Sequence, residues 1–376
     1  MNRVMAQVAV AQSSPPPNVI PLKVEMSSPP SPWILNPAMD LIFCCGGLLW
    51  LFFLFHNAVP LFPGDQVGLL LLVSVAGTHI LSETHTAATL VRLHSSADTQ
   101  KHLRSYVKYV SIICALIAIV GLATPALTPI FAKIYFVWIV QHFLAQSYGI
   151  TLIYCYKRNY SLSNTERKIL KFLFDATIVY AIARQFTYQE WGSDNFLGKP
   201  LPYFQLLPEW FCSCLAGVVQ FAALAFVCMV IAKFIRERKL IPLPAALLMV
   251  TGISIFLFPK SIANSLWLYV PAFYHGCQYL VVATSFRLKE QGLPENVSTH
   301  QLGRLLLRSS NLQYWGQLFM IAIFIYVGVP RLLNQLGVDF VTAFATIFCV
   351  INFHHFLVDA AIWKLRDSKV RKLLIA

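Results

Sequence analysis

Long runs of apolar side chains constrain this chain more than any other feature. Crossing the hydrocarbon core of a bilayer as a helix takes about 20 mainly apolar residues. Runs approaching that length recur along the 376 residues, for example LIFCCGGLLWLFFLF at 41–55. Hydrophobic residues make up 57% of the chain and charged residues only 12%, whereas about a quarter of a soluble domain is charged. Because backbone groups in lipid must be hydrogen bonded internally, we predict an all-α integral membrane protein.

The apolar runs divide the chain into a membrane domain and two tails. Residues 1–33 contain SSPPPNVIP and SSPPSPW, and they predict a disordered, cytoplasmic tail rich in proline and serine. Residues 34–366 form the membrane domain, and residues 367–376 form a basic cytoplasmic tail. Within this domain we predict a polytopic bundle of about ten transmembrane helices, at residues 38–56, 67–91, 106–124, 130–156, 169–187, 210–235, 244–259, 262–286, 314–330 and 339–364.

The positive charges test this topology independently. Lysine and arginine in short loops collect on the cytoplasmic side of a membrane. With ten spans, most of the 29 lysines and arginines fall on the side of the two termini, and the other side receives Lys133, Arg184, Lys199, Lys260 and Arg331. We therefore expect both termini to be cytoplasmic. The same distribution accounts for the net charge of +13 without a nucleic-acid partner.

The cysteines and the familiar short motifs exclude several other classes. Cys44 and Cys45 are adjacent and Cys212 and Cys214 are two residues apart, so neither pair suits a disulfide or a C-x-x-C metal site. The sequence contains no phosphate-binding loop, no G-x-G-x-x-G, no H-E-x-x-H and no G-x-S-x-G motif. Nucleotide-dependent and serine-hydrolase chemistry therefore have no sequence support.

Ionisable side chains interrupt four of the apolar runs at a similar depth. They are His79, Glu83 and His85 in 67–91, His142 in 130–156, His275 in 262–286, and His354, His355 and Asp359 in 339–364. These spans all run toward the cytoplasm, and each carries a histidine roughly 10 to 15 residues before its cytoplasmic end. Four helices thus place histidines in one layer, in the middle or the inner half of the bilayer.

A second regularity is the spacing of these polar residues. Each span pairs a histidine with a polar residue four positions later, as His79 with Glu83, His142 with Gln146, His275 with Tyr279 and His355 with Asp359. Residues four apart share one helical face, and a metal-bound imidazole needs a partner that orients its ring. We predict a shared metal site with the ligands His79, Glu83, His85, His142, His275, His354, His355 and Asp359.

Other polar residues are expected to support this site. Glu83, Asp359 and Tyr279 are the candidate catalytic groups, and Gln146, Gln278, Asn352 and Asp175 are candidates for orienting the ligands. The competing interpretation is that each histidine makes a separate hydrogen bond between helices. Because a charged residue at the bilayer centre costs about 2.5–3.5 kcal/mol on insertion scales, Glu83 and Asp359 require partners. That requirement, and the common depth, favour the shared site.

Imidazole and carboxylate ligands without thiolate favour non-haem iron, with zinc as the alternative. An iron site within the membrane predicts an oxidoreductase of oxygenase, hydroxylase or desaturase type that acts on a lipid, an isoprenoid or a carotenoid. The sequence NFHHFLVD supplies only a double histidine, so the H-x-x-x-H and H-x-x-H-H boxes of membrane desaturases are absent. No family is assigned on these residues.

Two other functions remain open from the sequence. A zinc ion held by histidines would suit a membrane lipid hydrolase, with Glu83 or Asp359 as general base. Buried histidines and carboxylates would also suit a proton- or metal-coupled transporter, although the polar residues occupy one layer and do not cross the membrane. The expected partners are membrane lipids, a lipophilic substrate and, for an oxygenase, an electron-donor protein on the cytoplasmic side. The expected location is the plasma membrane or another internal membrane.

Overall fold

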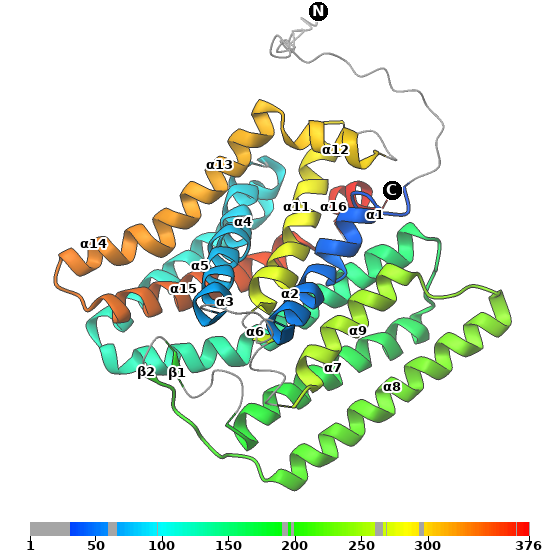
Figure 1. Cartoon of the computed structure of the whole chain (residues 1–376), viewed down its shortest axis with the longest axis horizontal. Helices are drawn as coiled ribbons and strands as arrows, with labels where there is room; N and C mark the ends of the chain where they lie inside the picture. The colour runs from blue at the N-terminus through cyan, green and yellow to red at the C-terminus, as the bar shows by residue number, and fades with distance from the viewer. Residues whose placement is uncertain are drawn as a thin grey trace, which may run out of the picture.

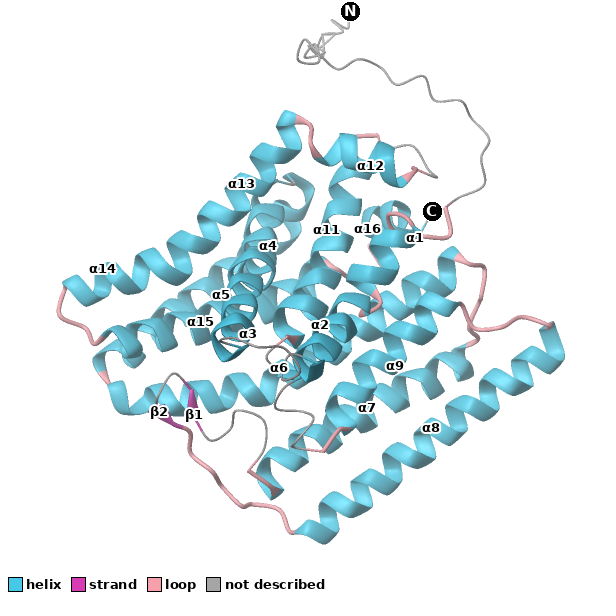
Figure 2. Cartoon of the chain, viewed as in Figure 1, coloured by secondary structure: helices cyan, strands magenta, loops and turns pink. Residues whose placement is uncertain are grey.

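The computed structural model describes residues 31–58, 66–95, 97–189, 195–196, 199–259, 266–267, 269–292, 297–365 and 367–375. The tail predicted over residues 1–33 lies outside this part of the chain, apart from its last three residues. The described residues form an assembly of helices in which segments far apart in sequence lie side by side (Figure 1). Within the described residues, Figure 2 shows strand structure only in one small pair, β1 (Asn195–Phe196) and β2 (Lys199–Pro200).

The helices follow the apolar runs closely. In chain order they are α1 (Pro37–Met39), η1 (Asp40–Cys44), α2 (Gly47–Ala58), α3 (Gln66–Gly77), η3 (Thr78–Ser82), α4 (Glu83–Ser95), α5 (Ala97–Ala123), η4 (Pro125–Leu127), α6 (Thr128–Lys157), α7 (Asn164–Thr187), α8 (Glu209–Glu237), α9 (Leu243–Leu257), η5 (Pro271–Gly276), α11 (Cys277–Glu290), α12 (Thr299–Leu306), α13 (Ser309–Ile323), η6 (Phe324–Gly328), α14 (Val329–Gln335), α15 (Phe340–Ile362) and α16 (Ser368–Ile375). Segments η1, η3, η5 and η6 are π-helical turns, and η4 is a 3₁₀ turn.

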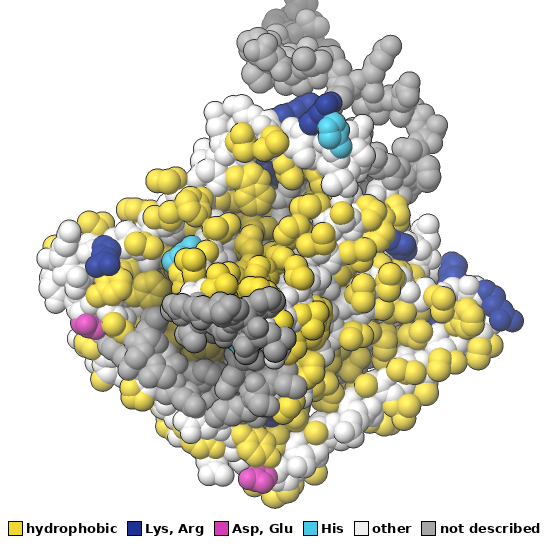
Figure 3. Space-filling view, in the orientation of Figure 1, with side chains coloured by type: hydrophobic (Ala, Val, Ile, Leu, Met, Phe, Trp, Pro, Cys, Tyr) yellow, Lys and Arg dark blue, Asp and Glu magenta, His cyan; other side chains and the backbone are white. Residues whose placement is uncertain are grey.

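Within the described residues, five helices are long and apolar enough to cross a membrane. They cover Leu103–Ala123, Pro125–Lys157, Glu209–Glu237, Ser309–Gln335 and Phe340–Ile362. The segments Pro37–Cys44 and Gly47–Ala58 pass the same test together but are bent by 52°. Large apolar side chains such as Phe221 and Leu224 on α8 are exposed, and hydrophobic side chains dominate the visible face (Figure 3). The all-helical prediction is thus confirmed, with an apolar exterior typical of a membrane protein.

Helices that are distant in sequence pack in pairs around the centre. Helix α5 lies along α15, α7 along α8, and α4 along α13, while α6 contacts both α9 and α15. Helix α4 also packs against α15, α11 and η5. The segments that carry the predicted site histidines therefore meet in the core of the bundle.

Close approach of η3 and η5 depends on a residue without a side chain. A Cβ atom on Gly276 would lie 2.8 Å from the backbone carbonyl oxygen of Leu81. Backbone atoms cannot move aside cheaply, so only glycine fits at this position. The contact holds His275, the neighbour of Gly276, at the packed centre of the bundle.

An ion cluster ties α7 to α8. Glu166, which is also part of the N-terminal capping box of α7 with Ser163, lies 3.1 Å from Nζ of Lys233 and 2.8 Å from Nη2 of Arg236. Burial by itself would raise the pKa of Glu166. Hydrogen bonds from the Ser163 backbone N–H, Lys233 and Arg236 outweigh burial and lower this pKa from 4.5 to about 2. The folded state therefore favours the charged carboxylate.

This cluster predicts an acid-sensitive contribution to stability. Because the folded pKa is depressed, the contribution is present above pH 4.5 and is lost as the pH falls toward 2. We expect Glu166→Gln to lower the free energy of unfolding by about 1–2 kcal/mol at pH 7. When the pH is lowered from 5 to 3, the melting temperature should fall less in the variant than in the wild type. Asp175→Asn, which removes an exposed pair with Lys171, is the control and should change stability by less than about 0.5 kcal/mol. Equal acid sensitivity of wild type and Glu166→Gln would contradict the assignment.

Candidate metal centre

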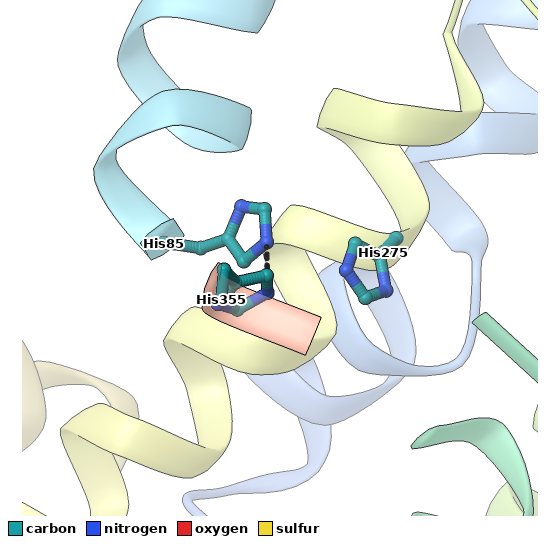
Figure 4. A group of neighbouring side chains, drawn as sticks. All are labelled: His85, His275 and His355. Carbon is teal, nitrogen blue, oxygen red and sulfur yellow. Dashed lines mark hydrogen bonds between the residues drawn. The ribbon is translucent and has the colours of Figure 1, made fainter. Parts of the chain in front are cut away.

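Four buried histidines from four separate segments converge in the core. They are His85 on α4, His142 on α6, His275 on η5 and His355 on α15. The most exposed of them, His142, is 6% accessible. Figure 4 shows His85, His275 and His355 facing one another from three ribbons. The four residues come from the second, fourth, eighth and tenth predicted spans.

One pair of ring nitrogens lies at the separation expected of two ligands to one ion. Nε2 of His85 is 3.1 Å from Nε2 of His355. Two nitrogens bound to one ion at about 2.0–2.1 Å are roughly 2.9–3.4 Å apart for angles between 90° and 109°. One ligand atom from each of His85, His275 and His355 can be chosen so that all three lie within 4.8 Å of one another. This triad can therefore converge on a metal ion.

Asp359 adds a carboxylate to the cluster. It lies one helical turn after His355 on α15 and is 7% accessible. His142, His355 and Asp359 form a second group whose ligand atoms lie within 4.8 Å of one another. His355 belongs to both groups. The two groups together offer four imidazoles and one carboxylate.

A hydrogen-bond chain fixes the tautomer of His355. The hydroxyl of Thr89 donates to the hydroxyl oxygen of Tyr279 at 2.7 Å and lies 2.9 Å from Nδ1 of His355. Since the Thr89 proton is used toward Tyr279, Nδ1 of His355 must donate to Thr89. The Nε2 atom of His355 then carries the lone pair and faces His85. This is the arrangement that a metal-ligating imidazole needs.

Several buried polar atoms of the cluster have no partner among the described residues. They include both ring nitrogens of His275, Nε2 of His142 and Oδ1 of Asp359. Leaving a buried donor or acceptor unsatisfied costs about 1–3 kcal/mol. A metal ion could accept the lone pair of one His275 nitrogen in the first group, or those of Nε2 of His142 and Oδ1 of Asp359 in the second. The unsatisfied atoms of His142, His275 and Asp359 therefore fit a metal site better than a purely structural network.

Aromatic contacts hold two of the imidazoles in place. The ring of His275 stacks on Phe143 with centroids 4.0 Å apart, and the ring of His142 stacks on Phe356 at 4.3 Å. The ring centroids of His142 and His275 are 4.8 Å apart. Stacked neighbours restrict rotation of each ring, so the donor atoms are positioned before any ion binds.

Three predicted ligands, His79, Glu83 and His354, lie outside the two groups formed by the described residues. Nδ1 of His79 is 2.7 Å from Oε2 of Glu83, and the His79 side chain is 35% accessible. Neither residue belongs to the two groups of converging ligand atoms formed by the described residues. The π-helical turn η3 ends directly before Glu83, and it is His85 on the following helix that contacts His275 and His355.

Other predicted residues are distributed around the cluster. Nε2 of His354 is 3.0 Å from the hydroxyl of Ser111, and Asn352 donates to the carbonyl of Phe348. Asp175 is bonded to Lys171 on the exposed face of α7. Gln146 donates to the backbone carbonyl of His275, and to Gln278. Of these residues, Gln146 thus supports a site histidine, whereas Asp175 is remote.

Sequence reasoning missed two kinds of supporting residue. Thr89, which orients His355, lies four positions after His85, and extending the i to i+4 regularity to that position would have found it. Arg92 lies between two aromatic rings, 3.7 Å from the centroid of Phe286 and 3.9 Å from that of Trp363. Its side chain holds α4 against α11 and the end of α15. No local sequence pattern indicates this contact.

A cavity of about 190 Å³ adjoins the cluster. His142, Tyr279 and Asp359 contribute to its lining, whereas the rest is mainly apolar and includes Ile150, Val282, Phe356, Leu365 and Leu374. Reactive polar groups beside an apolar space are the usual composition of a ligand site. Two of the candidate ligands, His142 and Asp359, therefore face a space that an apolar molecule could enter.

This donor set indicates a particular kind of centre. Imidazole and carboxylate suit a transition-metal ion of intermediate softness, and the buried position excludes bulk water. The cluster can hold a metal ion next to an apolar cavity. Neither a protein-family model, nor a curated protein, nor a solved structure matches this chain.

Proposed function

We propose that this chain is a membrane-embedded, metal-dependent oxidoreductase of oxygenase, hydroxylase or desaturase type that acts on a lipophilic substrate. One observation carries the proposal. Four buried histidines and Asp359 converge from four helices, and two of these five residues, His142 and Asp359, also line an apolar cavity.

The number of donors favours iron. Catalytic zinc is usually held by three protein ligands, whereas this cluster offers four imidazoles and one carboxylate without a thiolate. Iron held by histidine and carboxylate with open positions supplies the chemistry of dioxygen activation. The chain itself would hold the ion through His85, His142, His275, His355 and Asp359, and Thr89 would keep the His355 tautomer suited to binding.

The reaction class sets what else must reach the site. Hydroxylation consumes a C–H bond, one dioxygen molecule, two electrons and two protons, and yields an alcohol and water. Tyr279 and Asp359 line the cavity and would deliver or receive protons there. The two electrons require an external donor, and the basic cytoplasmic loops would suit an acidic redox protein.

The membrane topology is part of the same proposal. Ten spans with both termini in the cytoplasm would explain the distribution of lysine and arginine. The centre would then lie in the middle or the inner half of the bilayer of the plasma membrane or another internal membrane. Membrane lipids would surround it, and an apolar substrate would reach it without crossing water.

A zinc-dependent lipid hydrolase is the second candidate, because one observation favours it. His85, His275 and His355 alone form a three-histidine group, which is a ligand set of catalytic zinc, and Asp359 would then serve as a general base. Metal identity separates the two candidates.

The test is metal analysis of the purified full-length protein by mass spectrometry, followed by oxygen-consumption and ester- or amide-cleavage assays with membrane lipids. We expect about one equivalent of iron or more per chain, and oxygen uptake that depends on that iron. Zinc with lipid cleavage would replace the oxidoreductase with the hydrolase. A folded protein that binds neither metal, even after reconstitution, would reject both.

A further inference from the structure

The cavity beside the metal centre opens sideways on the bundle. Gln141 and Ala145 near the middle of α6 and Ala360 on α15 line it and are exposed, whereas His142 and Asp359 are buried. The middle of a membrane-spanning helix faces hydrocarbon where it is exposed. A molecule that enters between α6 and α15 therefore passes from lipid directly to the metal ligands.

Small residues leave the entrance open. Ala145, Gly149 and Ala360 line the cavity, and a Cβ atom added at Gly149 would meet no other atom within 4 Å. The space beside Gly149 is thus wide enough for a side chain or for a slender apolar chain. This position allows the cavity to be filled by substitution without a clash.

One polar residue of the lining, Gln146, has an unused hydrogen-bonding capacity. Nε2 of Gln146 donates to the carbonyl oxygen of His275 at 3.1 Å and to Oε1 of Gln278 at 3.0 Å. Because a carbonyl oxygen only accepts, the amide orientation of Gln146 is fixed. Its Oε1 atom is buried and accepts no hydrogen bond from the described residues. Oε1 is therefore an acceptor without a partner just behind the cavity wall, and a donor group of a ligand would reach it once a neighbouring lining side chain turns aside.

We infer that the substrate is a long-chain lipid that carries a hydrogen-bond donor, a hydroxyl or an amide N–H, close to the carbon that reacts. This inference rests on the proposed function. The donor would bind Oε1 of Gln146, and the reacting carbon would lie about one helical turn away, about 6 Å along the chain, beside His142 and Asp359. The remaining chain would extend into the lipid through the entrance at Ala145 and Ala360.

The test uses two photoreactive probes of equal chain length, a diazirine-bearing hexadecanol and its methyl ether. Metal-loaded full-length protein in lipid nanodiscs is labelled with each probe, and the labelled peptides are mapped by mass spectrometry. We expect saturable labelling of α6 and α15 that is about three- to tenfold stronger for the alcohol, because only the alcohol can donate to Gln146. Equal labelling by both probes would overturn the donor assignment.

A pair of glycine variants tests the entrance. Gly149→Leu is expected to reduce labelling by both probes at least fivefold, because leucine fills the cavity. Gly217→Leu on α8, where an added Cβ also meets nothing within 4 Å, is the matched control and should label as the wild type does. Unchanged labelling in Gly149→Leu would overturn the assignment of this cavity.

Metal content, measured on the same samples, keeps the two proposals separate. Metal-loaded protein without saturable labelling would overturn the substrate class and leave the metal centre intact. Metal-free protein that is still labelled with a preference for the alcohol would support the lipid site and overturn the metal-dependent function.

Discussion

Replacing His355 with alanine is expected to remove almost all bound metal from the purified protein. His355 is the one residue common to both groups of converging ligand atoms, so its loss leaves each group with two donors. Changing a residue that only orients a ligand typically weakens metal affinity 10- to 100-fold, and losing this shared ligand should weaken it on the order of 100-fold or more. Metal content after gel filtration, with a chelator competition, measures the effect.

The neighbouring histidine supplies the control for this experiment. His354 points to Ser111, so His354→Ala should retain the metal content of the wild type. Thermal melts of both metal-free variants verify that each is folded. Stoichiometric metal in His355→Ala, or an equal loss in both variants, would contradict a centre built around His355.

The depth of the site histidines along their helices can be predicted from the sequence. The rise of a helix is constant, so counting residues from the predicted cytoplasmic ends of the spans places His142, His275 and His355 in one layer. The structure brings these three residues together. Their shared depth follows from span boundaries, whereas their convergence depends on which helices are neighbours.

The choice between His79 and His85 shows where that reasoning stops. On an ideal helix the i to i+4 pair of His79 and Glu83 resembles the pair of His355 and Asp359. In the structure His79 and Glu83 bond to each other, away from the cluster, and His85 takes the central position. His79 lies within the π-helical turn η3, and His85 lies in the α-helix that follows it. Such a turn rotates all following side chains around the helix axis, and no sequence pattern predicts where it occurs.

The all-helical fold class could also be predicted, because it depends only on the length of the apolar runs. The bend between η1 and α2 depends instead on local packing. The cavity depends on side chains from several segments, including Leu374 of the C-terminal helix α16. The tail predicted over 367–376 contains this helix, whose Val370 and Leu374 are buried. Long-range packing of this kind lies beyond single-sequence periodicity.

Asp359→Asn is expected to stabilise the metal-free protein and to weaken its response to metal. Oδ1 of Asp359 is buried and accepts no hydrogen bond from the described residues, and burying a charged carboxylate whose two oxygens are not both hydrogen bonded lowers stability. A neutral amide of the same shape should therefore raise the free energy of unfolding of the metal-free form by about 1 kcal/mol. In the metal-bound form the carboxylate would be a ligand, so its loss should weaken metal affinity by at least the 10- to 100-fold that loss of an orienting residue causes.

The two effects have opposite signs, which makes the variant informative without a known substrate. A metal that binds more tightly stabilises the folded state more. The stabilisation is about 4 kcal/mol when the free metal concentration is 1,000 times the dissociation constant. Thermal melts with and without iron should thus show a higher midpoint for metal-free Asp359→Asn and a smaller shift on adding iron. Asp175→Asn, which alters an exposed carboxylate on α7, should behave as the wild type in both conditions. If Asp359→Asn instead destabilises the metal-free protein and keeps the full metal shift, Asp359 has a structural role and the centre contains only histidine ligands.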